Sequence, residues 1–165
     1  MNKEERFTEI YHQNKDKIYR LCLGFMGNKP DADDLLQEIL IKIWDNLSAF
    51  KGNSSIATWI YRIATNTAIL YSKRKSRRNS KHAPLKSDNE RILSAVALDP
   101  GIPEQQINEL YTAISSLKEI DRIVIGLLLE GNSYSDIADI TGLSSSNVGV
   151  RINRIKKALN KKLKK

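Results

Sequence analysis

Hydrophobic residues recur three or four positions apart along most of this chain, which is the spacing of one buried face of an α-helix. In the first half the pattern predicts helices over residues 4–25, 31–47 and from 54 or 55 to 78. In the second half it predicts helices over residues 103–117, 119–130, 134–140 and 145–163. No segment alternates with the period of two that marks a half-buried strand, and there is no β-hairpin signal. The sequence therefore predicts an all-α protein.

The stretch between the two sets of helices has little sustained periodicity. Residues 79–103 hold three of the four prolines, which is typical of a linker. We therefore expect two small helical domains, residues 1–78 and 104–165, joined by a linker over residues 79–103.

The same pattern predicts where helices begin and which side chains they bury. Asp31 is expected to cap the second helix, after the break at Gly27 and Pro30. That helix should bury its apolar residues Leu36, Ile39, Leu40, Ile43 and Trp44. The third helix should bury one stripe of residues: Ile56, Trp59, Ile60, Ile63, Thr67 and Leu70.

Residues 134–153 fit a helix-turn-helix unit. Ala138 is small where two helices must approach, Gly142 suits the sharp turn, and Val148 can pack the second helix onto the first. Ser144 can cap the second helix, whose buried stripe should be Val148, Ile152, Ile155, Leu159 and Leu163. The polar residues Ser144, Asn147, Arg151 and Arg154 fall within about 80° of arc on another face. Short hydrogen-bonding groups followed by guanidinium groups suit a helix that reads the major groove. A helical hairpin with a solvated basic tail is the alternative, which the agreement in register disfavours.

Acidic residues are absent from residues 46–87 and 140–165, and these two stretches carry 17 of the 27 Lys and Arg residues. The net charge of the chain is +8. Such segregation indicates two positive surfaces that contact a phosphate backbone. Residues 31–45 reverse the balance, with five acids (Asp31, Asp33, Asp34, Glu38 and Asp45) against Lys42. The charge pattern therefore predicts nucleic acid contacted at two places, and a basic protein partner.

The third predicted helix has an exposed face that suits a nucleic-acid strand. Its residues fall within about 80° of arc: Thr58, Arg62, Asn66, Ile69 and Lys73. An ordinary solvated helix face is the alternative, and the pattern alone does not choose between them.

Other classes of protein find little support. No phosphate-binding loop, catalytic triad or metal-ligand spacing is present, so we expect no enzyme, no cofactor and no metal site. His12 and His82 lie far apart, and the single cysteine, Cys22, is expected to be buried. The longest apolar run, Ile123 to Leu129, is far shorter than the roughly 20 residues of a membrane span. The polar N-terminus is unlike a secretory signal, so we expect a cytoplasmic protein with no direct membrane insertion.

Two blocks of sequence resemble a known family. The block Asp31-Ala-Asp-Asp-Leu-Leu-Gln-Glu-Ile-Leu-Ile-Lys-Ile-Trp44, followed by Phe50 to Asn66, closely resembles region two of extracytoplasmic-function (ECF) sigma factors of bacterial RNA polymerase. Residues 117–121, 133–140 and the predicted reading helix are similar to their region four. The resemblance implies a sigma factor that binds core polymerase and directs it to promoters.

The resemblance also implies site residues. Those that bind core polymerase would be Asp34, Leu35, Gln37 and Glu38, although Leu35 could equally be a core residue. Those that bind and melt the minus-ten element would be Phe50, Lys51, Asn53, Ser54, Arg62, Asn66, Lys73 and Arg74. Those that read the minus-thirty-five element would be Ser144, Ser145, Ser146, Asn147, Arg151, Arg154 and Lys157.

Further expectations accompany that resemblance. An anti-sigma protein is an additional partner that it implies. Trp59 could stack on a base, but its place on the apolar stripe favours core packing. Leu70 stands where family members usually have Asp, so promoter preference cannot be transferred.

The length of the linker suggests how the domains behave. Promoter elements about two helical turns apart lie roughly 70 Å apart along the duplex. A linker of 25 residues reaches about 80–90 Å when extended but spans only about 25–30 Å as a random coil. Without polymerase, we expect the two domains to pack together, to hide both basic faces and to bind promoters weakly.

Two other functions compete with this one. A freestanding helix-turn-helix repressor or activator would leave the acidic residues 31–45 without a use. An RNA-binding protein would explain the charge but not the missing recognition motifs.

Overall fold

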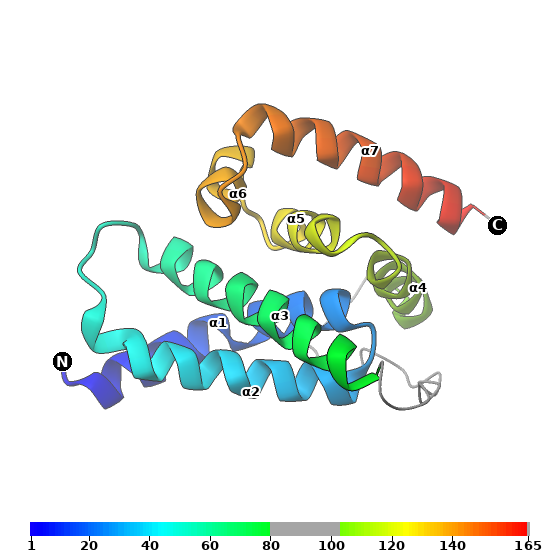
Figure 1. Cartoon of the computed structure of the whole chain (residues 1–165). Coiled ribbons are helices and arrows are strands. Elements are labelled where there is room, and N and C mark those ends of the chain that lie inside the picture. The colour runs from blue at the N-terminus through cyan, green and yellow to red at the C-terminus, as the bar shows by residue number, and fades with distance from the viewer. Residues whose placement is uncertain (80–102, 165) are drawn as a thin grey trace.

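The computed structural model describes residues 1–79 and 103–164, which form seven α-helices and one short 3₁₀ helix. The predicted linker lies almost wholly outside the described residues, as does His82. The N-terminal lobe contains α1 (Lys3–Met26), α2 (Lys29–Asn46), η1 (Leu47–Ala49) and α3 (Ile56–Asn79). The C-terminal lobe contains α4 (Glu104–Ser115), α5 (Glu119–Leu129), α6 (Tyr134–Thr141) and α7 (Ser145–Leu163). The described residues contain no strand, which confirms the all-α prediction and its two lobes (Figure 1).

In the N-terminal lobe, α2 and α3 pack against each other and against α1. The boundary between α1 and α2 differs from the prediction. Asn28 rather than Asp31 caps α2, because the Asn28 side chain accepts a hydrogen bond from the backbone N–H of Asp31 at 2.9 Å. The Asp31 carboxylate accepts a bond from Asn28 Nδ2 at 2.8 Å, so the two side chains close the helix end together.

The predicted stripe on α3 is wrong at two of its six positions. Leu70 is 57% exposed and Ile56 is 37% exposed, although both were expected in the core. Ile60 and Thr67 are buried as predicted, and the buried face also contains small and aromatic residues that were not predicted: Tyr61, Ala64, Thr65, Ala68 and Tyr71. Small side chains at positions 64 and 68 let α3 lie close to its neighbours, so the buried face follows them rather than the bulky aliphatic residues.

In the C-terminal lobe, α6 and α7 form the predicted helix-turn-helix. Gly142 ends α6 in the left-handed conformation, with φ of 82°, and Val148 is fully buried. Ser144 caps α7 by accepting a hydrogen bond from the N–H of Asn147. One detail is wrong: Leu163, at the end of the predicted stripe, is 39% exposed.

The two lobes pack on each other through three pairs of helices, α1 with α4, α1 with α5, and α3 with α6. Figure 1 shows α5 and α4 lying over the N-terminal lobe, with α7 on the far side. Close approach depends on small residues at the contact. A Cβ atom at Gly126 would lie 2.6 Å from Cδ1 of Leu21, and one at Gly24 would lie 3.3 Å from the ring of Tyr111. The missing side chains at these two positions therefore favour the close approach of these helices, since a Cβ at either position would require Leu21 or Tyr111 to shift.

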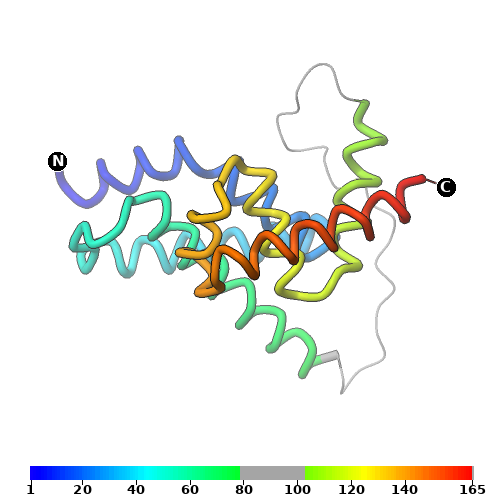
Figure 2. Tube along the Cα trace, turned by 90° about the horizontal axis from the view of Figure 1, so that it is seen from above, coloured from blue at the N-terminus to red at the C-terminus, as the bar shows by residue number. Residues whose placement is uncertain are grey.

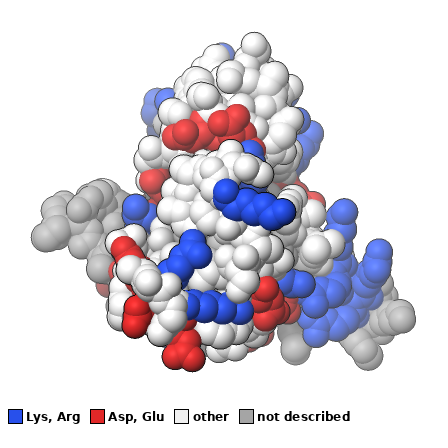
Figure 3. All heavy atoms as spheres, turned by 90° about the vertical axis from the view of Figure 1, so that its left-hand side faces the viewer, with Lys and Arg blue, Asp and Glu red and all other residues white. Residues whose placement is uncertain are grey.

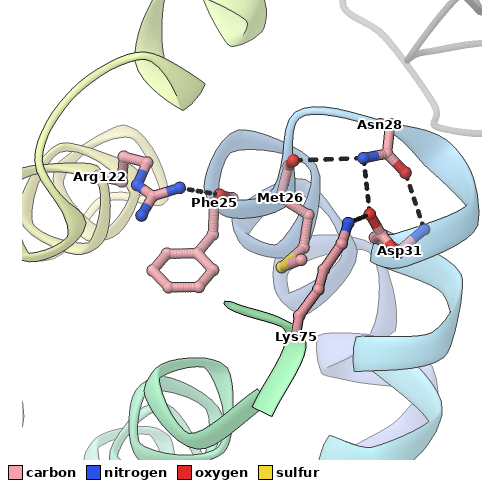
Figure 4. Close-up of polar contacts among 6 residues, drawn as sticks. All are labelled: Phe25, Met26, Asn28, Asp31, Lys75 and Arg122. Carbon is pink, nitrogen blue, oxygen red and sulfur yellow. Dashed lines mark hydrogen bonds and ion pairs between the residues drawn. The ribbon is translucent and has the colours of Figure 1, made fainter. Parts of the chain in front are cut away.

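Polar contacts also join the lobes. Arg20 of α1 forms a bidentate ion pair with Glu130, with Nη2 2.7 Å from Oε1 and Nε 3.0 Å from Oε2. The Glu130 side chain is only 5% exposed, so the pair is largely removed from water. Arg122 of α5 donates a hydrogen bond to the Phe25 carbonyl at 2.7 Å and lies over the ring of that residue (Figure 4). The expectation that the lobes pack together is thus confirmed.

Candidate polymerase and nucleic-acid interfaces

The outer face of α2 is acidic and points away from the core. We call it the α2 docking face and define it as Asp34, Gln37, Glu38, Ile41 and Asp45. Asp34, Gln37 and Asp45 are exposed, and Ile41 is 58% exposed in the middle of the face. Leu35, one of the predicted polymerase contacts, is fully buried. Leu35 is therefore a core residue rather than a polymerase contact, because a side chain on the inner face of α2 cannot reach a partner.

Two acids of α2 form ion pairs with the basic end of α3. Arg74 Nη2 lies 2.5 Å from Oε2 of Glu38, and Lys75 pairs with Asp31 beside Asn28 (Figure 4). Burial lowers the pKa of Lys75, and the nearby positive charge of Arg78 lowers it further. Figure 3 shows Lys and Arg gathered at the lower right, next to Asp and Glu. The structure therefore brings together Glu38 and Arg74, which the sequence assigned to different partners.

The loop between η1 and α3 contains a glycine in the left-handed conformation and an aromatic contact. Gly52 has a φ of 76°, and Lys51 and Asn53 are exposed. The ring of Phe50 lies 5.1 Å from that of Trp59, which is only partly buried against the core. Ser55 caps the start of α3, since its hydroxyl accepts a bond from the N–H of Thr58. The predicted loop is thus a surface feature set beside a partly covered tryptophan.

The predicted nucleic-acid face of α3 contacts α6 at Arg62. Arg62 Nε donates a hydrogen bond of 3.0 Å to the backbone carbonyl of Asp139 in α6. Asn66 and Lys73, further along the same face, are exposed. In this arrangement α6 engages one donor of Arg62, although Arg62 is itself exposed.

The predicted reading face of α7 is open in the same arrangement. Ser144, Ser145, Ser146, Asn147, Arg154 and Lys157 are all exposed. Figure 2, seen from above, shows α7 lying over the other helices, with nothing described above it. The expectation that packing hides both basic faces is therefore wrong: α7 is accessible, and Arg62, Asn66 and Lys73 of α3 stay exposed although α6 contacts Arg62.

Arg151 differs from its neighbours on α7. Its Nη1 lies 3.1 Å from Oδ1 of Asp121 in α5, and its Nε donates to Oδ1 of Asn147 at 2.7 Å. Both side chains of the ion pair are less than a quarter exposed. The geometry indicates that Arg151 holds α7 to α5 and orients Asn147, in contrast to the exposed Arg154.

Two exposed apolar residues on these faces were not predicted as site residues. Ile41 stands among the acids of the α2 docking face, and Val150 is 57% exposed on α7 between Asn147 and Arg154. The signal was present in the sequence, because residues 34 and 41 are two helical turns apart and share a face. Neither residue was predicted to lie in a buried stripe, and neither was assigned to a site.

Candidate chemistry elsewhere in the described residues is sparse. Cys22 is fully buried, as expected, and burial raises the pKa of its thiol far above the usual range. No group of three or more His, Cys, Asp or Glu side chains that could hold a metal ion occurs in residues 1–79 and 103–164. None of the helices in these ranges is long and apolar enough to span a membrane.

Comparisons with known proteins identify the family. Residues 10–78 match Sigma-70 region 2, and residues 107–159 match Sigma-70, region 4. The chain is 31% identical over 169 residues to the ECF RNA polymerase sigma factor SigW of Bacillus subtilis, covering 98% of this chain and 90% of that protein. The chain belongs to the extracytoplasmic-function (ECF) sigma factors. It directs RNA polymerase to initiate transcription at specific promoters.

Other relatives agree with this assignment. The ECF RNA polymerase sigma-E factor of Escherichia coli is 34% identical over 168 residues, covering 97% of this chain and 87% of that protein. Among solved structures, the sigma factor RpoE in complex with the anti-sigma factor NepR from Bartonella quintana has a TM-score of 0.74 at 22% identity. It covers 97% of this chain and 98% of its own. CnrH in complex with the cytosolic domain of CnrY has a TM-score of 0.68 at 20% identity, covering 98% and 89%. At such identities these structures support the fold of this sigma factor.

Proposed function

We propose that this sigma factor uses three separate surfaces. The α2 docking face binds a basic surface of core polymerase. The loop over residues 50–54 and the exposed face of α3 hold the melted minus-ten element. The outer face of α7 reads the minus-thirty-five element in the major groove. Residues 1–78 would then form sigma region two and residues 104–165 sigma region four, joined by a linker over residues 79–103.

The α2 docking face supplies the observation that carries this proposal. Its acids point outward around Ile41, which is 58% exposed. An apolar side chain ringed by charged groups is the arrangement of an interface anchor, because the surrounding polar contacts exclude water from it. Acids there attract a basic partner and would repel DNA, so this face suits polymerase and the Lys- and Arg-rich faces suit the promoter.

The proposal for the minus-ten element rests on α3 and the adjacent loop. Lys51, Asn53, Asn66 and Lys73 are exposed on a surface whose sequence contains no acid from residue 46 to residue 87. Capturing a base outside the duplex costs a few kcal/mol, which stacking and hydrogen bonds must offset. Since α6 lies on α3 near Arg62, we propose that the lobes separate before the whole face binds a strand.

Three further statements belong to this proposal. An anti-sigma protein is a partner, because a sigma factor of the same fold has been solved in such a complex. The protein acts in the cytoplasm, where polymerase and promoters meet. Its role is regulatory rather than enzymatic, as is general for sigma factors.

The test is transcription from a cognate promoter by reconstituted holoenzyme, with core binding measured separately. Asp34→Arg and Ile41→Asp should each weaken core binding at least about tenfold, the effect of losing an interface hot spot. Glu9→Arg, a charge reversal at an exposed position of α1, should bind core as the unchanged chain does. Glu38→Arg is a poorer choice because it also removes the partner of Arg74.

The fold of each variant is checked by thermal unfolding. Core binding that is unchanged in both folded α2 variants would refute the docking assignment. A chain that binds core but never supports promoter-specific RNA synthesis would refute the assignments on α3 and α7.

A further inference from the structure

One residue on the outer face of α7, Val150, is apolar, whereas its exposed neighbours are polar. Val150 is 57% exposed, and the exposed residues one turn away on either side are Asn147 and Arg154. The buried residues of α7 lie on the opposite side, at Val148, Ile152, Ile155 and Leu159. At 100° per residue Val150 points roughly 180° away from the middle of that buried stripe. It therefore lies on the solvent-facing side of α7, next to Arg154 at one edge of the predicted reading face.

Nothing within the protein accounts for a valine at this position. A β-branched residue is a weaker helix former than Ala, Lys or Glu, and here its methyl groups gain no core packing. Single exposed apolar residues are common, so exposure alone carries no conclusion. The position of Val150 is informative, because the exposed residues around it on α7 are all polar: Ser146, Asn147, Asn153 and Arg154.

The ion pair between Arg151 and Asp121 determines how Asn147 is oriented on this face. Arg151 is tied to Asp121, and its Nε donates to Oδ1 of Asn147 at 2.7 Å. This bond uses one lone pair of the amide oxygen and leaves the amide donor of Asn147 free to reach a base. A donor beside a pair of methyl groups complements thymine, which shows an acceptor oxygen and a methyl group in the major groove. Cytosine and adenine instead show an amino donor there, and guanine shows only acceptors.

We propose that Val150 packs against the methyl group of a thymine in the minus-thirty-five element, with the amide donor of Asn147 beside it. This rests on the proposed function of α7 and names a base that it selects. Val150 and Asn147 would then determine sequence specificity, while Arg151 positions Asn147 from behind. Lysines such as Lys157 contribute affinity without specificity because they reach phosphates.

Thymine and uracil differ in this methyl group alone, so exchanging them provides the test. Promoter duplexes are first enriched by reconstituted holoenzyme from a library randomised across the upstream element. Each thymine of the enriched element is then replaced singly by deoxyuridine, and holoenzyme binding is measured. We expect one position at which the replacement weakens binding about fourfold, the factor for burying one methyl group.

Variants connect that position to Val150. Val150→Ala should bind the unmodified promoter about fourfold more weakly and should no longer distinguish thymine from deoxyuridine there. Lys157→Ala is the matched control on the same helix. It should weaken binding to both promoters alike and keep the ratio between them, because a phosphate contact does not sense the methyl group. Circular dichroism checks that both variants are folded. We expect them to be, because both positions are exposed.

The outcomes separate the two proposals. If holoenzyme prefers the enriched element to a scrambled one but ignores every deoxyuridine, the thymine contact is wrong and the function of α7 stands. The same holds if the enriched element contains no thymine, or if Val150→Ala keeps the deoxyuridine effect. If holoenzyme does not distinguish the enriched from the scrambled element, the proposed function of α7 is itself wrong.

Discussion

Replacing Glu130 with Gln should loosen the contact between the two helical lobes by about 2 kcal/mol. Glu130 follows α5 in the C-terminal lobe and pairs with Arg20 of α1 in the N-terminal lobe. Burial, and after it the negative charge of Glu130, raises the pKa of Tyr61 and of Tyr111 to about 12. The carboxylate thus lies against side chains from both lobes, and its loss should be felt at their interface.

The magnitude follows from geometry and burial. The Arg20 guanidinium makes three contacts of 2.7–3.1 Å with the carboxylate, and hydrogen bonds to charged groups contribute about 1.5–3 kcal/mol. Removing one partner of a fully buried pair costs about 3–5 kcal/mol. The Arg20 side chain is 25% exposed, so water can solvate it when Glu130 is lost, and the lower part of the range applies. Arg20→Gln should cost more, because it leaves the carboxylate buried without its cation.

The assay is fluorescence transfer between dyes on cysteines introduced at Ser48 and Asn160, one exposed position in each lobe. Cys22 is fully buried and should not react. Transfer is followed during urea titration, together with circular dichroism. Loss of about 2 kcal/mol raises the open fraction by at most about thirtyfold, and the affinity for a minus-ten single strand should rise in proportion. Combining Arg20→Gln with Glu130→Gln and comparing the double variant with the two single ones should give a coupling energy of about 2 kcal/mol between these residues.

Glu109→Gln is the control, because Glu109 is exposed and its Oε1 accepts a hydrogen bond from Gln105 within the same helix, α4. It should leave fluorescence transfer and strand affinity unchanged. Glu130→Gln behaving like Glu109→Gln would show that the ion pair does not hold the lobes together. A looser interface without any gain in strand affinity would show that α6 does not limit access to α3.

Two further substitutions test the packing. Leu35→Ala should lower the free energy of unfolding by about 2–5 kcal/mol in urea titration, because Leu35 is fully buried, and should leave the core affinity of the folded fraction unchanged. Weaker core binding by folded protein would restore Leu35 as a contact. Gly27→Ala should destabilise the protein by about 1–2 kcal/mol for its φ of +81°, plus about 1–3 kcal/mol for a Cβ placed 2.7 Å from Cβ of Ser115. Gly131→Ala, with φ of +90° and nothing within 4 Å of the added Cβ, should show only the cost of the backbone conformation. Equal losses of stability in the two variants would argue against close packing at Gly27.

Local signals predicted the C-terminal lobe well. The turn glycine, the capping serine and the packing valine of the helix-turn-helix lie within a few residues of one another, and Gly142, Ser144 and Val148 all behave as expected. A motif whose determinants are close in sequence can be interpreted from the sequence alone. The boundary at Asn28 was missed, because Asn28 and Asp31 lie three residues apart and both are residue types that cap helices.

Features made by distant residues could not be predicted in this way. Arg20 and Glu130 are 110 residues apart, and nothing local marks either as a partner for the other. The buried face of α3 depends on what packs against Ala64 and Ala68, so counting bulky aliphatic residues placed Leu70 inside when it is exposed. Arg151 was grouped with Arg154 by helical spacing, but its role is set by Asp121 on another helix.

The contact between Glu38 and Arg74 has a consequence for the order of assembly. While the two side chains neutralise each other, α3 offers less positive potential to a nucleic acid than its sequence suggests. A cationic polymerase surface that engages Glu38 would return a full charge to Arg74. Docking to polymerase would then increase the affinity of α3 for promoter DNA by electrostatics alone, with no movement of either helix. Raised ionic strength would reduce this increase in affinity.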